Sequence, residues 1–244
     1  MRQQIHIASV HHCANADECM MDEEIKGTSV LCHHLRKHDV RCFAPCDGFA
    51  RIIIFLSGAG TAESEGNRTV MNENDVYVQK PDMSVSVRTG EEAIVVELIR
   101  RVTEQEFGQF SGCEQLPYLA SYQNAKTYRE ECKSEKTINR MLIPARIVPR
   151  FAMGSVETSG VDRVEPHSHP MLDLFFLGMR DNHCTVIADG QRQRFESGVL
   201  LHIPLGSNHG VVSEQEDCVR YYWMDFLFDE EGLAYMDSAH EMEE

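Results

Sequence analysis

The sequence has no apolar run that approaches the roughly 18 residues of a membrane-spanning helix. Its first residues, MRQQIHIASVHH, lack the basic cluster followed by an apolar segment that marks a secretory signal. Positive charge is also scarce, because 23 Lys and Arg residues stand against 39 Asp and Glu residues, a formal net charge of −16. This balance disfavours binding to phosphate backbones and anionic membranes, and an anionic ligand would need a local cation, either Arg, Lys or a metal. We therefore expect a cytoplasmic protein with neither a nucleic-acid nor a membrane partner.

A cysteine framework for a structural zinc site is absent as well. The nine cysteines are an odd number, and no two of them form a CxxC pair. Cys42 and Cys46 are the closest two, and they lack the companion pair that a structural zinc site needs. We expect reduced thiols rather than a disulfide framework.

Short β-branched and aromatic runs fill much of the chain. They include RIIIFLSG, DVYVQKPD, SVSVRTGE and AIVVELI in the first half, and DLFFLGM, HCTVIADG, GVLLHIPLG and CVRYYWMDF in the second. Such runs, separated by Gly, Asn, Asp and Pro, are typical of β-sandwiches and barrels. The stretch 103–140 is polar and poor in β-branched residues, which indicates a partly helical linker. The sequence therefore predicts two β domains, residues 1–115 and 116–244.

The stretch EPHSHPMLDLFFLG places His167, His169 and Asp173 directly before an apolar run. Side chains alternate between the two faces of a strand, so these three residues share a face if the strand is regular through Pro170. Burying several polar groups without a shared partner is unfavourable, which points to a bound ion. Six histidines lie in the first forty residues without a partner acid at a repeated spacing, and we expect most of them at the surface or in caps. They are His6, His11, His12, His33, His34 and His38.

A second stretch, GVLLHIPLGSNHG, carries Gly198, Pro204, Gly206 and His209. It resembles the second cupin motif, and HSH with Asp173 and Gly178 resembles the first. The resemblance implies a small β-barrel in which one metal is held by His167, His169, Asp173 and His209. Asp173 stands where glutamate is commoner. Three imidazoles and one carboxylate suit Zn, Fe, Mn, Ni or Co, and we expect one divalent transition metal per chain, with zinc as the first expectation.

The first β domain lacks this ligand pattern. In ENDVYVQKPDMSVSV, Ser86 occupies the place of the second-motif histidine. We expect a metal-free structural barrel that offers an oligomerisation surface, and hence a homo-oligomer. The predicted fold class is all-β: a bicupin of two cupin-type β-barrels (double-stranded β-helix, jelly-roll) with a partly helical linker.

A closer resemblance comes from short segments that flank the motifs. GAGT (residues 58–61), KTINRMLIP (136–144), YYW (221–223) and Met236-Asp237 occur in the order seen in 5-keto-4-deoxyuronate isomerase, and 5-deoxyglucuronate isomerase shares that fold. The resemblance spans about residues 50–240, although the N-terminal part is shorter and the acid follows the second histidine by one residue fewer. It implies a metal-dependent isomerase, an intramolecular oxidoreductase that interconverts ketose and aldose forms of a sugar acid. The expected partner is thus a small-molecule sugar acid.

Two other readings of the sequence stay open. One is a metal-dependent cupin enzyme of another class, such as an iron dioxygenase, and the other is a non-catalytic sugar-binding bicupin. The catalytic base is unassigned, although Glu165 and His202 lie near the motifs in sequence. Arg192 and Arg194 could either clamp a carboxylate or face outward.

Overall fold

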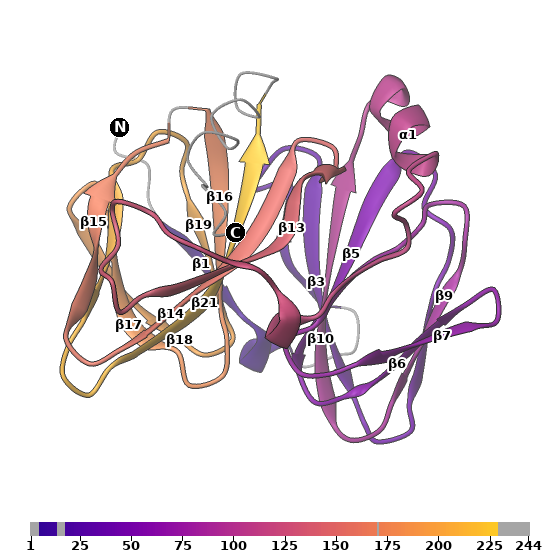
Figure 1. Ribbon diagram of the computed structural model, residues 1–244, viewed down its shortest axis with the longest axis horizontal. Coiled ribbons are helices and arrows are strands. Elements are labelled where there is room, and N and C mark those ends of the chain that lie inside the picture. The colour runs from indigo at the N-terminus through magenta and orange to yellow at the C-terminus, as the bar shows by residue number, and fades with distance from the viewer. Residues whose placement is uncertain (1–4, 14–17, 170, 229–244) are drawn as a thin grey trace. The chain divides into compact units, whose positions relative to one another are not determined.

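The computed structural model describes residues 5–13, 18–169 and 171–228. These residues divide into two compact units (Figure 1). The N-terminal unit comprises residues 10–13, 18–124 and 147–149, and the C-terminal unit comprises residues 5–9, 125–146 and 150–228. The longest uninterrupted part of the N-terminal unit therefore ends at Asn124. All nine cysteines are free thiols, as expected.

The N-terminal unit consists of two antiparallel sheets. One has the strand order β11-β8-β5-β10-β3-β2, and the other has the order β4-β9-β6-β7. The bounds are β2 (Glu18–Asp22), β3 (Thr28–Leu35), β4 (Val40–Phe43), β5 (Phe49–Ser57), β6 (Gly60–Ser64), β7 (Asn67–Met71), β8 (Val76–Val78), β9 (Val85–Thr89), β10 (Ala93–Arg101) and β11 (Tyr118–Ala120). Apolar side chains of both sheets, among them Phe43, Ile53, Phe55 and Val95, form one buried core. This packing of alternating inward residues is what the sequence rhythm predicted.

Helical structure is confined to short segments among the described residues. The helix α1 (Glu104–Ser111) begins at a capping box, in which Thr103 and Glu106 each accept a hydrogen bond from the other's backbone N–H. The 3₁₀ turns are η1 (Val10–His12) and η2 (Tyr122–Asn124). None of these helices has the length and apolar character needed to cross a membrane.

The C-terminal unit is built on one antiparallel sheet of eleven described strands. Its main path runs β1-β19-β16-β21-β14-β13-β12, while β15, β20, β17 and β18 pair alongside. The bounds are β1 (His6–Ser9), β12 (Thr127–Tyr128), β13 (Ile138–Val148), β14 (Phe151–Ser159), β15 (Asp162–His167), β16 (Leu172–Gly178), β17 (His183–Ala188), β18 (Gln191–Glu196), β19 (Val199–Ile203), β20 (His209–Ser213) and β21 (Cys218–Leu227). The strand nearest the N-terminus, β1, pairs with β19 in this unit, with His6 opposite His202.

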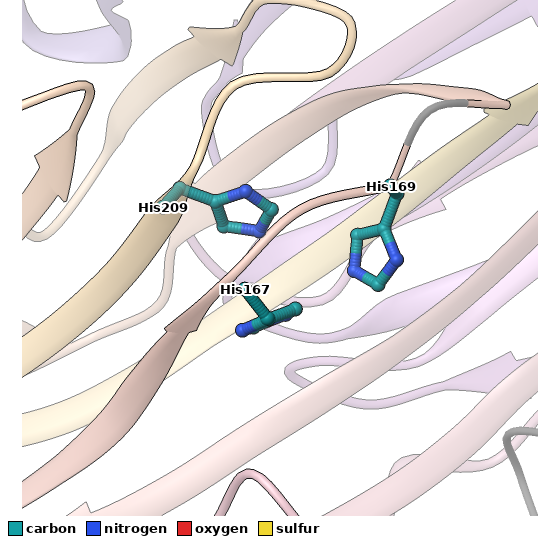
Figure 2. Close-up of side chains that lie close together, drawn as sticks. All are labelled: His167, His169 and His209. Atoms are coloured by element: carbon teal, nitrogen blue, oxygen red, sulfur yellow. The ribbon is translucent and has the colours of Figure 1, made fainter.

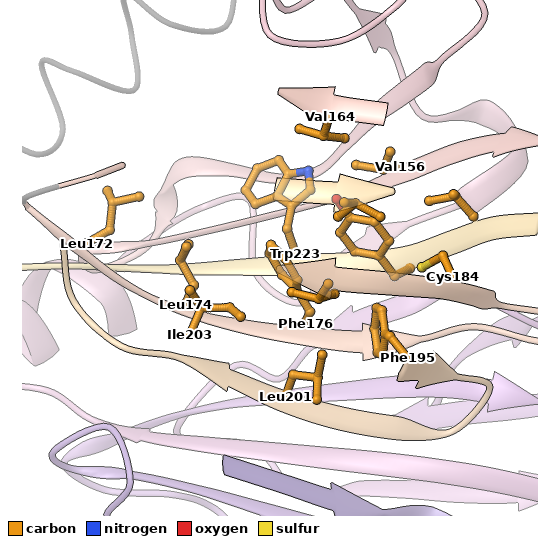
Figure 3. Close-up of a cluster of buried hydrophobic side chains, with 14 of the residues drawn as sticks. Val156, Val164, Leu172, Leu174, Phe176, Cys184, Phe195, Leu201, Ile203 and Trp223 are labelled. Carbon is orange, nitrogen blue, oxygen red and sulfur yellow. The ribbon is translucent and has the colours of Figure 1, made fainter. Parts of the chain in front are cut away.

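Turn chemistry and alternation explain the local geometry of this unit. Asp189 and Gly190 both have positive φ (49° and 80°) in the two-residue turn that joins β17 to β18, which suits a type I′ hairpin. Along β16, Leu172, Leu174 and Phe176 point into a buried apolar core that Figure 3 shows between the strands. The residues between them therefore face the other side of the sheet. The all-β fold predicted from the sequence is confirmed.

Candidate metal centre

Three of the four predicted metal ligands lie together in the C-terminal unit. His167 ends β15 and His209 begins β20, and the two residues are directly opposite each other in the antiparallel ladder. His169 follows two residues after His167, beyond the end of the strand. Ligand atoms of the three side chains lie within 4.8 Å of one another. Figure 2 shows the three imidazoles gathered around a common space, with ring centroids 4.6–5.5 Å apart.

Backbone carbonyls fix the tautomer of two of these histidines. The Nδ1 of His167 lies 2.8 Å from the carbonyl oxygen of Glu165, and the Nδ1 of His209 lies 3.0 Å from that of Ser207. A carbonyl oxygen only accepts, so each Nδ1 must carry the proton and donate it. The Nε2 of both rings is then left with its lone pair. Outer hydrogen bonds of this kind orient metal-binding imidazoles, so the donor set fits a divalent metal ion.

His209 is held in its neutral form. Its side chain is buried at 3% exposure, and its ring centroid lies 5.9 Å from that of Phe176. Burial, helped by the nearby His167 and His169, lowers the pKa of His209 to about 3 against the opposing hydrogen bond to Ser207. A neutral imidazole is the form that binds metal, so the ring needs no proton loss at neutral pH.

The structure does not bring Asp173 to the three histidines. Asp173 lies between Leu172 and Leu174, which face the core, so its side chain is on the opposite face of β16. There its carboxylate is 2.9 Å from the Nε2 of His202. The expected shared face depended on one continuous strand, but β15 ends at His167 and β16 begins at Leu172. Pro170, where the sequence suggested a bend, lies outside the described residues, as do Met236 and Asp237.

The other polar residues near the motifs point elsewhere. Glu165 is exposed and forms an ion pair with Arg163 at 2.5 Å. Arg192 is exposed, and Arg194 binds Asp217 at 2.6 Å. None of these three, nor His202, is among the residues that gather at the histidine cluster.

Sequence reasoning missed a buried charged group in the same unit. Glu130, Lys133 and Asp225 lie in or beside the apolar core of this barrel. Glu130 and Lys133 belong to a segment outside the named strands, where no periodic pattern identifies a buried face. Asp225 sits in YYWMDF, where the alternation of a strand is the one available signal.

A second missed feature lies inside the N-terminal unit. His33 is fully buried, unlike the other five N-terminal histidines, which are exposed as expected for most of the six, and its Nε2 lies 2.9 Å from Glu97. Arg51 donates to the same carboxylate from Nε at 2.7 Å and also contacts Gln79. Burial opposes ionisation of Glu97, but the hydrogen bond from His33 and the charge of Arg51 outweigh it and lower the pKa of Glu97. Because every member has a partner, this network is accounted for as a structural element of that barrel.

Comparison with known proteins gives the fold. No protein-family model matches the sequence, and no curated protein is similar to it. Solved structures do resemble it: a cupin 2 conserved barrel domain protein from Leptotrichia buccalis has 14% identity and a TM-score of 0.61, covering 91% of this chain and 96% of that one. An IolB-like protein from Salmonella typhimurium has 11% identity and a TM-score of 0.64, covering 95% and 98%. A salicylate 1,2-dioxygenase from Pseudaminobacter salicylatoxidans has 8% identity and a TM-score of 0.62, covering 98% and 88%. At these identities the likeness shows that the barrels are of the cupin type and nothing finer.

Proposed function

We propose that the chain is a metal-dependent isomerase that interconverts the ketose and aldose forms of a sugar acid, with one divalent transition metal held by His167, His169 and His209. The observation that carries the proposal is the convergence of three imidazoles within 4.8 Å. Backbone carbonyls hold two of them with Nε2 free. Neutral imidazoles suit zinc first, and also Fe, Mn, Ni or Co.

A site with three protein ligands leaves coordination positions for a substrate. When bound, the metal would supply Lewis-acid stabilisation of the negative charge that develops on substrate oxygens during isomerisation. The chain itself orients the imidazoles through the carbonyls of Glu165 and Ser207. Phe176 and Trp223 belong to the apolar core of the barrel, and the ring of Phe176 lies 5.9 Å from that of His209.

The choice of reaction is supported by the ordered resemblance to the keto-uronate isomerases and by the likeness to the IolB-like protein. We extend the proposal to a small-molecule sugar acid as ligand and to a cytoplasmic homo-oligomer as the working form. The sugar acid follows from the family resemblance, and the homo-oligomer follows from the oligomerisation surface expected on the first barrel.

A second candidate is a metal-dependent dioxygenase. It is favoured by the likeness to the salicylate 1,2-dioxygenase. A third is a sugar-binding barrel without catalysis. Consumption of O₂ distinguishes the dioxygenase from the isomerase. Exchange of substrate hydrogen with solvent distinguishes the isomerase from the sugar-binding barrel.

The test begins with elemental analysis of the protein purified without added metal. We expect close to one transition metal per chain. The metal-loaded protein is then incubated with a panel of keto-uronates and aldoses in D₂O, where an isomerase exchanges the hydrogen on the carbon next to the carbonyl. Chelation should abolish the exchange, and added divalent metal should restore it. Binding of a keto-uronate without exchange or interconversion would refute the isomerase, and turnover that requires O₂ would favour the dioxygenase.

A further inference from the structure

A short segment of the C-terminal unit carries a charged side chain into the barrel. Lys133 forms an isolated antiparallel bridge with Val164, and the N–H of Glu165 donates to the carbonyl of Cys132 at 2.9 Å. Residues opposite each other in an antiparallel pair project to the same face. Val164 belongs to the interior core, so Lys133 also points inward, and its side chain is only 6% exposed.

Lys133 is held there by an acidic partner and an aromatic ring. Its Nζ lies 2.8 Å from Oε2 of Glu130, whose side chain is 15% exposed. The same Nζ lies 6.0 Å from the ring centroid of Tyr128, which is buried. The thiol of Cys132 is 3.5 Å from Oε2 of Glu130. A buried ion pair adds little to stability compared with an apolar pair of similar size, so folding alone does not explain this one.

Asp225 is the third ionisable group in this interior. It lies opposite Ala152 of β14 and Leu174 of β16, and both neighbours belong to the interior core. Its own exposure is 6%. Burial raises the pKa of Asp225 well above its usual range, the charge of Glu130 raises it further, and Lys133 offsets part of that rise. The two carboxyl groups of this interior thus differ in their surroundings, since Glu130 is paired with the cation of Lys133 and Asp225 lies between apolar neighbours.

The charged group and the histidines share one interior. Val164, the bridge partner of Lys133, lies on β15 three residues before His167. Phe176 contacts His209 and is also paired across the sheet with Trp223, two residues before Asp225 on β21.

We propose that Glu130 is the general base and Asp225 the general acid of the reaction at the histidine cluster, and that Lys133 is a positioning residue for Glu130. The inference rests on the proposed isomerase function.

Glu130 removes the proton from the hydroxyl-bearing carbon, the C–H electron pair forms the new C=C bond, and the carbonyl π pair moves to oxygen. Asp225 gives its proton to that oxygen, and Glu130 returns its proton to the neighbouring carbon while the C=C pair closes that C–H bond. The other hydroxyl gives its proton back to Asp225 as its O–H pair forms the new carbonyl, so both residues end in their starting states.

The experiment uses the full chain loaded with metal and compares Glu130→Gln, Asp225→Asn and Lys133→Met with a matched control. The control is Glu157→Gln, because Glu157 is a half-buried acid on β14 that pairs with Arg140 and Arg220 on the outward face. Metal content is measured by elemental analysis, solvent exchange by NMR in D₂O with keto-uronates, and binding of oxalate by calorimetry. Oxalate is the probe because it is a planar dianion with neighbouring oxygens, and its affinity reports the site charge without turnover.

Each variant has its own expected pattern. Glu130→Gln keeps its metal, loses exchange by about 100-fold or more, and binds oxalate on the order of tenfold more tightly because a negative charge is gone. Asp225→Asn keeps the exchange of substrate hydrogen with solvent but loses the interconversion of ketose and aldose. The ratio of the exchange rate to the interconversion rate therefore rises. Lys133→Met shifts the acidic limb of the pH–rate profile to higher pH, and Lys133→Arg restores it in part. The control changes none of these by more than about twofold.

Failure of this inference is separable from failure of the proposed function. A wild type that exchanges no hydrogen in any keto-uronate overturns both. A wild type that exchanges, with undiminished exchange in Glu130→Gln, overturns the inference alone. If Glu130→Gln does not fold because Lys133 is left buried and unpaired, the double variant Glu130→Gln/Lys133→Met replaces both charges with neutral groups of similar size. Exchange at the wild-type rate in that folded, metal-loaded double variant would also overturn it.

Discussion

Replacing His167 by alanine should remove most of the stabilisation that a divalent metal gives to the folded chain. His167 is the right position for this test because its side chain is partly exposed, so its loss leaves little packing defect in the metal-free protein. His209 is buried against Phe176, and its replacement would add a cavity to the loss of a ligand. The metal-dependent part of the stability is therefore read most cleanly at His167.

The size of the effect follows from the three-ligand geometry. At a metal concentration 100 times its dissociation constant, binding stabilises the native state by about 2.7 kcal/mol. Loss of a residue that only hydrogen-bonds to a ligand already weakens metal binding by up to about 100-fold. Loss of one of the three ligands themselves should therefore weaken binding by about 100-fold or more. The metal then stands near its dissociation constant, and the stabilisation falls to about 0.4 kcal/mol. For a chain of this size the metal-induced rise in Tm should drop from roughly 5–11 °C to about 1–2 °C.

The assay is thermal unfolding with and without metal at one fixed concentration, together with elemental analysis. His183→Gln is the control, since His183 lies in the same unit, is half exposed and pairs with Asp217 away from the cluster. All variants keep the nine cysteines, so any metal binding by these thiols in the unfolded chain cancels in the difference between variants. A metal-induced rise in Tm of wild-type size in His167→Ala would refute the assignment of His167 as a ligand.

Three further outcomes are expected. Gly154→Ala should destabilise the C-terminal unit by roughly 1–3 kcal/mol or more, because a Cβ would overlap Trp223 and the carbonyl of Arg140, and an unchanged urea midpoint would contradict this packing. Asp217→Asn should lower stability by about 2 kcal/mol at pH 7. The hydrogen bond from Arg194 lowers the pKa of Asp217 to about 2, so its contribution is present above the unfolded pKa of about 3.9 and is lost as pH falls toward about 2. Urea titrations at pH 7 and at lower pH should show the difference between variant and wild type shrinking, and a constant difference would count against the pair. In native protein a thiol reagent should modify the exposed Cys19 and Cys42 first. Early modification of the buried thiols would argue against the core packing; these are Cys32, Cys46 and Cys184.

The sequence by itself determined the features that depend on short-range chemistry. Alternating apolar runs separated by turn residues predicted two β domains, because the side-chain period of a strand is read along a few adjacent residues. The hairpin turn at Asp189-Gly190 and the capping box at Thr103 follow from the same local rules. The HSH pair and His209 were recognisable through their resemblance to the two cupin motifs, and the structure places His167 opposite His209 in paired strands.

Only the tertiary structure decided which residues share an interior. Asp173 could not be oriented from parity, since the chain turns between β15 and β16 and the alternation does not carry across the turn. The pairing of β1 with β19 joins segments far apart in the chain, and no local pattern encodes that register. Lys133 points into the barrel interior because it forms a single bridge with Val164. Asp225 points into the same interior because of its place on β21, which lies between β14 and β16. Burial and charge pairing are properties of the folded neighbourhood, which is why the group formed by Glu130, Lys133 and Asp225 emerges only once the strands are assembled.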